Sequence, residues 1–373
     1  MANLNDIVAV AEALEKSPVI VVRDRCAAVR NRNSSCRRCT DICPVNALDV
    51  SGNEITLSVS SCIGCGACCV VCPTKALVFA KPSDAELDER AYESLRSTNG
   101  TAVFACARIA SKRIADPSTY AEVPCLSRID EAAIVIAASR GAREVLLVDG
   151  DCSSCKYGAC SSITDETLAY ARSLLSTHGP GMQIRRLTGF PEKLRSSTPS
   201  ENAGTSRRAF FSEAVGVARD TAIAAAKTTV ENELGITDGE AAIGERLRVT
   251  ESGSLPRISV QRHDDILNAL DRMGVHADAT IESRLFAVVS VDEVRCNSCG
   301  MCAMFCPTGA LVRDKPKELG DPMRYLEFSA CDCVQCNLCK DVCWKSALTL
   351  TPTVPADELY DFEPTVFKPG SRW

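Results

Sequence analysis

The sequence contains few histidines and few aromatic residues. Its 373 residues include only 3 histidines, and aromatic residues make up 5% of the chain. His178, His263 and His276 are far apart in the sequence, so we predict a packed or surface role for each and no catalytic triad. No strand-like segment is followed by G-x-G-x-x-G and no P-loop is present, which leaves no recognisable nucleotide-binding motif.

Long apolar runs are also missing. No stretch approaches the ~18 unbroken apolar residues of a membrane span, so direct membrane insertion is not expected. The first residues have no basic segment, and Asp6, Glu12 and Glu15 interrupt their apolar positions, which argues against a secretory signal peptide. These features predict a chain that works in the reducing cytoplasm.

Excess positive charge is limited to one short segment. The formal net charge is −6, which gives no general basis for binding nucleic acid. The exception is a run that contains Arg23, Arg25, Arg30, Arg32, Arg37 and Arg38. Such a run is typical of a solvated loop, of a docking surface for an acidic redox partner, or of positive charge that raises the potential of a nearby cluster.

Cysteine, by contrast, is abundant. The chain has 23 cysteines, which form an N-terminal set at 26–72, a middle set at 106–160 and a C-terminal set at 296–343. A disulfide scaffold would be short and secreted, whereas clustered thiols in a reducing compartment bind metal. We therefore predict metal centres at both ends of the chain and a further one in its middle.

One short sequence occurs four times. Its copies are CTDICPVNAL at 39–48, CCVVCPTKAL at 68–77, CAMFCPTGAL at 302–311 and CKDVCWKSAL at 339–348. Each copy predicts a cysteine loop, a short helical turn and an apolar strand, which is too little to bury a core alone. Because the copies come in two pairs, we expect two units whose paired copies stack around their own cofactors.

The C-terminal pair has the regular spacing C-x2-C-x2-C-x3-C, followed once by Pro307 and once by Trp344. Three closely spaced thiolates surround three corners of a [4Fe–4S] cluster, and the fourth binds the neighbouring cluster. The predicted ligand sets are Cys296, Cys299, Cys302 and Cys343 for one cluster, and Cys333, Cys336, Cys339 and Cys306 for the other. A pair of zinc sites is the alternative, although zinc would leave the third cysteine of each motif unused.

The N-terminal pair departs from this spacing at one position. Asn33 stands where the first motif would need its leading cysteine, and the nearest upstream cysteine is Cys26. If Cys26 lies too far away, that cluster becomes a three-iron site or takes another ligand. Cys69 and Cys331 are left over and are expected to be packed thiols. The predicted ligand sets are Cys26, Cys36, Cys39 and Cys72 for one cluster, and Cys62, Cys65, Cys68 and Cys43 for the other.

Both pairs resemble the bacterial two-cluster ferredoxin family, over roughly residues 20–80 and 290–350. The resemblance implies the (βαβ)2 ferredoxin fold and one-electron transfer at low potential. It would give the chain four [4Fe–4S] clusters, two in each unit.

The middle set lies in a different pattern. Strands are expected at 101–106, 121–125, 144–148 and 183–187, alternating with helices at 130–140 and 164–179, which predicts a small parallel α/β layer. The carboxyl ends of parallel strands share one edge of the sheet, where ligands bind. The cysteines expected to converge there are Cys106, Cys125, Cys152, Cys155 and Cys160. Buried inert thiols and a zinc site are the alternatives.

The region from Val103 to about Pro191 is similar to the delta subunit of methyl-viologen-reducing hydrogenase. The similarity lies in VPCLSRIDEA (123–132), GAREVLLVDGDC (141–152) and CKY (155–157). That family binds a [2Fe–2S] cluster and links a hydrogenase or formate dehydrogenase to a heterodisulfide reductase. This sequence departs from the family in two places. A single cysteine, Cys106, stands where the family has its first pair, and the cysteine of the glycine turn comes later, at Cys152. The resemblance implies one [2Fe–2S] cluster held by Cys106, Cys125, Cys152 and Cys155, with Cys160 as a substitute ligand.

The expected architecture combines α+β and α/β classes, with two ferredoxin-like (βαβ)2 dicluster domains, a small parallel α/β domain between them and a helical linker. A polar linker at 195–206 precedes helix candidates at 207–227 and 262–273. The expected segments are a ferredoxin-like domain at 1–82, the α/β domain at 96–194, a linker and helical region at 195–285, a second ferredoxin-like domain at 286–353 and an extended tail at 354–373.

Together these predictions describe a non-catalytic electron-transfer subunit of an anaerobic, cytoplasmic oxidoreductase complex. Its catalytic partner would be a hydrogenase, a formate dehydrogenase or a flavin-containing, heterodisulfide-reductase type of subunit. Electrons would pass between the two ferredoxin-like units, with the middle site as a relay. One alternative is an iron–sulfur reductase with its own substrate site in the middle crevice, suggested by the spare Cys69, Cys160 and Cys331. A regulatory, cluster-sensing protein is the other, with the arginine run as its only hint.

Overall fold

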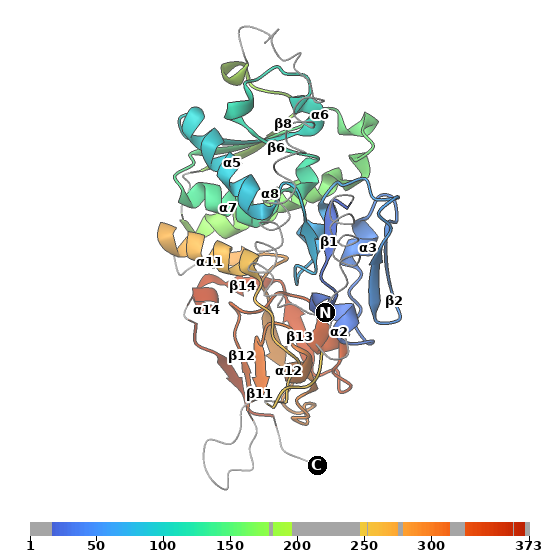
Figure 1. Cartoon of the computed structure of the whole chain (residues 1–373). Coiled ribbons are helices and arrows are strands. Elements are labelled where there is room, and N and C mark those ends of the chain that lie inside the picture. The colour runs from blue at the N-terminus through green and yellow to red at the C-terminus, as the bar shows by residue number, and fades with distance from the viewer. Residues whose placement is uncertain are drawn as a thin grey trace.

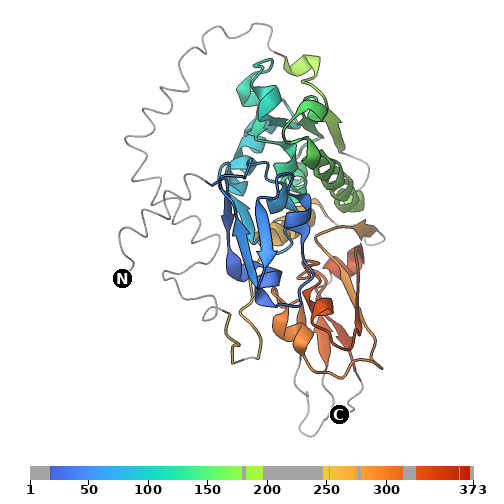
Figure 2. The same ribbon diagram turned by 90° about the vertical axis from the view of Figure 1, so that its right-hand side faces the viewer.

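The computed structural model describes residues 17–178, 182–195, 247–251, 253–274, 279–313, 325–360 and 362–369. Figure 1 shows an α/β domain at the top, the C-terminal unit at the bottom and the N-terminal unit beside both. The turned view in Figure 2 shows the same arrangement. Most of the expected polar linker at 195–206 and the whole helix candidate at 207–227 lie outside the described residues.

The N-terminal unit is built from two antiparallel strand pairs. β1 (Val19–Val21) pairs with β4 (Leu77–Phe79), and β2 (Leu48–Ser51) pairs with β3 (Glu54–Leu57). Short helices lie between β1 and β2, namely the 3-10 helix η1 (Arg23–Arg25), α2 (Ala27–Arg30) and α3 (Arg38–Ile42), and α4 (Ala67–Val71) lies between β3 and β4. Each copy of the repeat therefore places a short helix before a strand, α3 before β2 and α4 before β4.

The C-terminal unit has the same strand pairing. β10 (Val288–Val291) pairs with β13 (Leu348–Thr351), and β11 (Leu311–Arg313) pairs with β12 (Leu326–Phe328). The repeat helices are α12 (Met301–Phe305) and α13 (Leu338–Asp341). In both units the first strand pairs with the last and the two inner strands pair with each other.

The end of the chain folds back onto the C-terminal unit. β14 (Thr353–Pro355) pairs with β9 (Thr280–Glu282), α14 (Ala356–Tyr360) follows, and β15 (Thr365–Phe367) pairs with β12. An extended tail was expected from residue 354 onward. The segment instead contains a helix and a strand, because Ala356 and Leu359 are buried in the core of the unit.

The middle domain contains a four-stranded sheet in the order β6 (Ala121–Val123), β5 (Thr101–Cys106), β7 (Glu144–Val148), β8 (Gln183–Leu187). All three strand pairs are parallel, so the parallel sheet predicted from the sequence is confirmed. Every residue of β5 is buried, as expected for a central strand covered on both faces. Its carboxyl end carries Cys106.

Helices pack around this sheet. They are α5 (Asp84–Ser97), α6 (Ala107–Ala110), α7 (Glu131–Ser139) and α8 (Ser161–Leu175), with shorter 3-10 helices at Pro117–Thr119, Leu126–Arg128, Cys152–Ser154, Gly158–Cys160, Ser176–His178 and Glu192–Leu194. The helix α5 was not predicted from the sequence, although Leu87, Ala91 and Leu95 recur at helical spacing and are buried. Ser83 and Glu86 form a capping box at its start, so the middle domain begins near residue 83.

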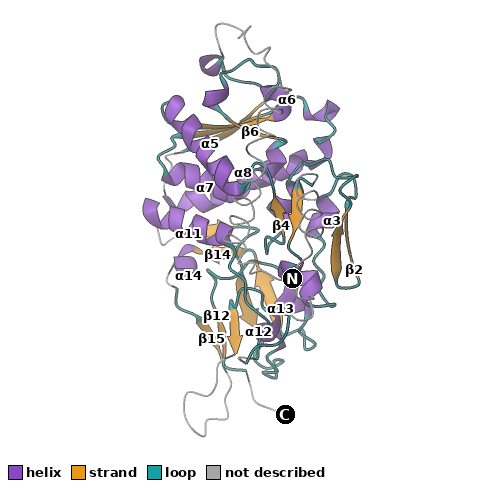
Figure 3. Ribbon diagram, in the orientation of Figure 1, coloured by secondary structure: helices purple, strands orange, loops and turns teal. Residues whose placement is uncertain are grey.

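One more helix connects the parts of the molecule. α11 (Gln261–Met273), expected at 262–273, packs against α7, and Figure 3 shows it below the helices of the α/β domain. Its buried Arg262 donates to the carbonyl oxygens of Val70 at 2.7 Å and Cys72 at 2.8 Å in the N-terminal unit. The buried Lys75 of that unit pairs with Asp130 of the middle domain at 3.3 Å. Among the described helices, none is both long and apolar enough to cross a membrane.

Candidate metal centres

Four thiols from separate parts of the N-terminal unit gather beside α2 and α3. This Cys26 group consists of Cys26, Cys36, Cys39 and Cys72, which interact electrostatically with one another. Cys26 follows η1 directly and caps α2, and this turn places its side chain beside those of the first motif. Burial, followed by repulsion from Cys72 and Cys36, raises the pKa of Cys26 to about 11.

A second set of thiols gathers beside α4, whose residues include Cys68. This Cys62 group consists of Cys43, Cys62, Cys65 and Cys68. Cys43 comes from the first motif and interacts electrostatically with Cys62 of the second, so the two motifs exchange their last cysteines. Cys69, one of the leftover thiols, is 1% exposed and adjoins this group.

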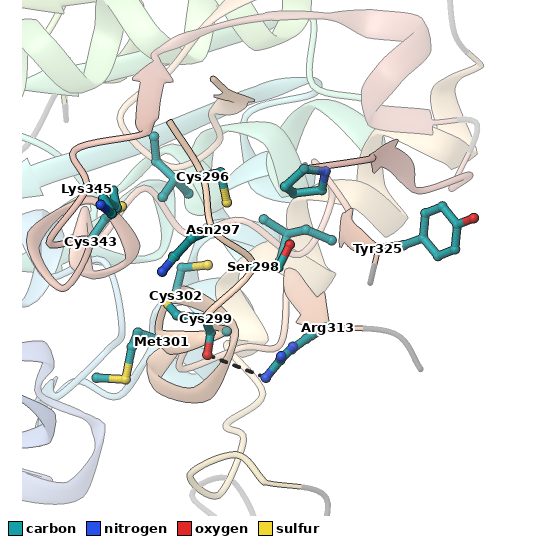
Figure 4. A pocket seen from close by; sticks show the side chains of 14 residues that line it. Cys296, Asn297, Ser298, Cys299, Met301, Cys302, Arg313, Tyr325, Cys343 and Lys345 are labelled. Carbon is teal, nitrogen blue, oxygen red and sulfur yellow. Dashed lines mark hydrogen bonds between the residues drawn. The ribbon is translucent and has the colours of Figure 1, made fainter. Parts of the chain in front are cut away.

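The C-terminal unit shows the same exchange between its motifs. The Cys296 group consists of Cys296, Cys299, Cys302 and Cys343, and the Cys333 group consists of Cys306, Cys333, Cys336 and Cys339. Figure 4 shows the Cys296 group around one hollow, which has a volume of about 440 Å³ including the space open to solvent. Burial, and then repulsion from the neighbouring thiols, raises the pKa of Cys302 to about 12.

The last cysteine of each repeat lies in the same local backbone structure. In three copies the N–H of the alanine four residues later donates to the cysteine sulfur: Ala47 to Cys43 at 3.2 Å, Ala76 to Cys72 at 3.2 Å and Ala347 to Cys343 at 3.3 Å. The residue before the alanine has a positive φ in all four copies, at Asn46, Lys75, Gly309 and Ser346. N–H donors directed at sulfur stabilise a thiolate, the form that binds metal.

The loops that carry the first three cysteines of a motif divide into two kinds. In three motifs the second and fourth residues after the leading cysteine have positive φ: Gly64 and Gly66, Ser298 and Gly300, Gln335 and Asn337. The first motif lacks both turns, and Arg37 at the equivalent position has a φ of −131°. The segment that begins at Asn33 therefore does not adopt the loop conformation of the other three motifs. The thiol that this motif lacks is supplied by Cys26.

The donor sets suit iron–sulfur clusters. Each group contains four thiols brought together from separate segments of its unit, and their mutual repulsion means that a bound metal centre must offset the charge of the thiolates. Within the described ranges, no three or more Cys, His, Asp or Glu side chains are arranged to hold a single metal ion.

The middle domain brings four cysteines to one hollow at the carboxyl edge of its sheet. This strand-end group consists of Cys106, Cys125, Cys152 and Cys155, and the hollow has a volume of about 400 Å³ including the space open to solvent. Cys160 does not line it. The Cys160 side chain is 0% exposed and packs against Cys65 of the N-terminal unit, with Cys125 beside them.

Charged side chains that the sequence analysis missed also line this hollow. Asp149 pairs with Arg186 at 2.6 Å, and the Cys152 sulfur lies 3.5 Å from the Asp149 carboxylate and 3.6 Å from the Arg186 guanidinium. Burial and the Asp149 charge raise the pKa of Cys152 to about 11, although Arg186 opposes them. The run DGDC after β7 and the arginines of QIRRL in β8 were the available signals.

The arginine run serves several purposes. Arg23, Arg32 and Arg37 are exposed. Arg30 is buried and donates to the Pro256 carbonyl at 2.7 Å, and it interacts electrostatically with Cys306 and Cys336. Part of the run is therefore positive charge beside thiols of the other unit. Arg25 is also buried, and Arg38 is half-buried and donates to the Gln335 carbonyl at 2.8 Å.

The described histidines are packed residues. His263 is buried against Phe286, with ring centroids 4.7 Å apart, and its Nε2 lies 2.6 Å from the Leu285 carbonyl oxygen. Burial, followed by the charge of Arg262, lowers the pKa of His263 to about 3. His178 contacts the Leu270 carbonyl at 3.0 Å, and His276 lies outside the described residues.

Comparisons with known proteins agree with an iron–sulfur chain. The family model of the 4Fe–4S binding domain matches residues 289–312, and that of the methyl-viologen-reducing hydrogenase delta subunit matches residues 98–189. An uncharacterized ferredoxin of Methanocaldococcus jannaschii is 32% identical over 75 residues, which are 20% of this chain and 39% of that ferredoxin. No solved structure matches the chain. The predictions of an iron–sulfur protein with a 4Fe–4S domain and a hydrogenase-delta-like region are confirmed.

Proposed function

We propose that this chain is an electron-transfer subunit that binds four [4Fe–4S] clusters and one [2Fe–2S] cluster. The observation that carries the proposal is the crossed grouping of thiols in two units with the same strand pairing. In each unit, the last cysteine of either motif joins the first cysteines of the other motif. This arrangement is typical of two-cluster ferredoxins, in which the fourth cysteine binds the neighbouring cluster.

Each group has a definite role in this proposal. The Cys26, Cys62, Cys296 and Cys333 groups hold the four [4Fe–4S] clusters, and the strand-end group holds the [2Fe–2S] cluster. Such clusters supply one-electron oxidation and reduction. The chain's own contribution is to bury the thiols, to exclude water and to direct backbone N–H groups at the sulfurs, all of which tune the potential.

The middle domain suggests the class of partner. Its region at 98–189 is similar to a subunit of a hydrogenase, and the strand-end hollow lies within that region. We propose an oxidoreductase complex of hydrogenase, formate dehydrogenase or heterodisulfide-reductase type, in which other subunits carry the catalytic centre. Copurification of such subunits with the natively expressed protein tests this part, and isolation of the chain with no redox partner would contradict it.

The iron content of the full chain tests the cofactor assignment. Four [4Fe–4S] clusters require about sixteen iron atoms, and a [2Fe–2S] cluster raises the number to about eighteen. We expect this content, with matching acid-labile sulfide, after anaerobic purification. Eight or fewer iron atoms together with stoichiometric zinc would overturn the proposal.

A further inference from the structure

We infer that the five thiol groups lie in single file, in the order strand-end, Cys62, Cys26, Cys333, Cys296. This inference rests on the proposed function and names the two places at which redox partners exchange electrons with the chain. The sequence places the strand-end group between the two ferredoxin-like units. In the folded chain that group lies at one end of the file, and the two units contact each other directly.

The contact between the two units lies between the Cys26 and Cys333 groups. Cys36 packs against the buried cluster that contains Cys336, and the two thiols interact electrostatically. Next to this contact, Ser35 donates from its backbone N–H to Asp341 at 2.7 Å. Arg38 donates to the Gln335 carbonyl at 2.8 Å, so hydrogen bonds on both sides fix Cys36 opposite Cys336.

The strand-end group contacts the N-terminal unit at Cys65. Cys125 packs beside Cys65 and interacts electrostatically with it, and the buried Cys160 lies in the same contact. Ser127 donates to the Cys65 carbonyl at 3.2 Å. Among the described residues, those lining the strand-end hollow all belong to the middle domain, and its Cys125 contacts Cys65 of the Cys62 group.

Within each unit the two groups are neighbours. Cys39 and Cys68 belong to one core cluster of the N-terminal unit and interact electrostatically. In the C-terminal unit, α12, which carries Cys302, packs against α13, which carries Cys339, and the two thiols interact electrostatically. Every consecutive pair in the proposed file therefore has both a packing contact and an electrostatic interaction.

Exposure of the thiols supports the assignment of the ends. In the strand-end group and in the Cys296 group, three of the four cysteines are partly exposed. The Cys62 group has two partly exposed cysteines, the Cys26 group has one, and the Cys333 group has none. Trp344, which follows Cys343, is 65% exposed, and Val294, two residues before Cys296, is 96% exposed. A partner can thus approach both ends, whereas protein encloses the Cys333 group.

Pulsed EPR of the dithionite-reduced full chain tests this order without an activity assay. Magnetic coupling between paramagnetic clusters falls steeply with distance, so each cluster enhances the relaxation of its neighbours most. Cys68→Ala, which removes a ligand of the Cys62 group, should abolish most of the relaxation enhancement of the [2Fe–2S] signal. Cys339→Ala and Cys299→Ala, which affect the Cys333 and Cys296 groups, should leave that enhancement nearly unchanged.

Other outcomes distinguish an error in the proposed order of the groups from an error in the proposed function. Loss of the enhancement in Cys339→Ala or Cys299→Ala, with the Cys62 cluster intact, would overturn the order while leaving the cofactor assignment standing. If the other four groups all bind their clusters but the strand-end group contains no iron, the strand-end group is not the end of the file. Absence of clusters from the wild-type chain would instead refute the proposed function.

Discussion

The repeated cysteine loops and the strand-end hollow reach four converging thiols by different routes. In the loops, three cysteines within seven residues are directed to one point by local turns, such as those with positive φ at Gly64 and Gly66. In the hollow, Cys106, Cys125 and Cys152 come from the ends of three different strands. A loop therefore holds its thiols by local backbone conformation, whereas the hollow depends on the assembled sheet.

The first motif falls between these two cases. It keeps Cys36 and Cys39 on a short segment but lacks the left-handed turns, and it takes Cys26 from the preceding helix. Once a loop loses a ligand, tertiary packing must supply it. The comparison thus predicts which substitutions have local consequences and which affect distant parts of the chain.

The largest expected effect comes from the crossed cysteines. Cys306→Ala should remove the cluster of the Cys333 group, a loss of about four of about sixteen cubane iron atoms, and should spare the cluster of the Cys296 group. Cys72→Ala should likewise remove the cluster held by Cys26, Cys36 and Cys39. Iron analysis and Mössbauer spectroscopy check both variants, with Cys331→Ala as the control. Crossed ligation would be contradicted if Cys306→Ala lost only the cluster of the Cys296 group, or if Cys72→Ala lost only the cluster of the Cys62 group.

A smaller loss of iron is expected in the middle domain. Cys125→Ala should remove about two iron atoms and the [2Fe–2S] EPR signal, because its strand end supplies one of the four thiols. The control is Cys160→Ala, which removes a thiol that packs against Cys65 but does not line the hollow. If the control loses the signal and Cys125→Ala keeps it, the ligand set of the hollow is different.

Asp130→Asn tests how the N-terminal unit is attached to the middle domain. Burial alone would raise the pKa of Asp130, but Lys75 and Arg262 hold it below its usual value. The carboxylate therefore stabilises the fold above its unfolded pKa of about 3.9, and this contribution is lost as the pH falls below that value. Asparagine can still cap α7, so the loss of charge is isolated.

We expect Asp130→Asn to destabilise the chain by about 3 kcal/mol near neutral pH, because it leaves buried cations less compensated. Anaerobic thermal denaturation at pH 7 and at lower pH checks this. The difference from wild type should shrink as the pH falls below about 4. An equal difference at all pH values would show that the charge of Asp130 is not responsible.

The smallest effect is expected at a turn of the second motif. Gly66 has a φ of +83°, and an added Cβ would lie 2.8 Å from Cδ and 2.9 Å from Cβ of Arg128. Gly66→Ala should therefore cost about 2 kcal/mol and shift Arg128, with all clusters retained. Gly52→Ala is the matched control, since Gly52 has a φ of +57° but open space around it. Similar losses in both variants would mean that the φ angle alone matters.

Several features of the fold could be predicted because their causes are local. The four strands of the middle sheet and α11 follow from apolar periodicity. The helix α5 carried the same signal and was missed, and the apolar residues of α14 were too few to indicate that the chain end folds back. Arg30 and Arg38 could not be distinguished from the exposed arginines, since their partners Pro256 and Gln335 are more than 200 residues away.

The sequence by itself determined which cysteines form sets, because the spacing within a motif limits how a short loop can direct its thiols. It also determined the α/β character of the middle domain through the alternation of strand and helix patterns. Only the tertiary structure decided that Cys26 lies beside Cys72, that Cys160 faces Cys65, and that the two terminal units contact each other at Cys36 and Cys336. Those contacts depend on the burial of apolar surface between segments far apart in the chain, for which spacing along the sequence carries no signal.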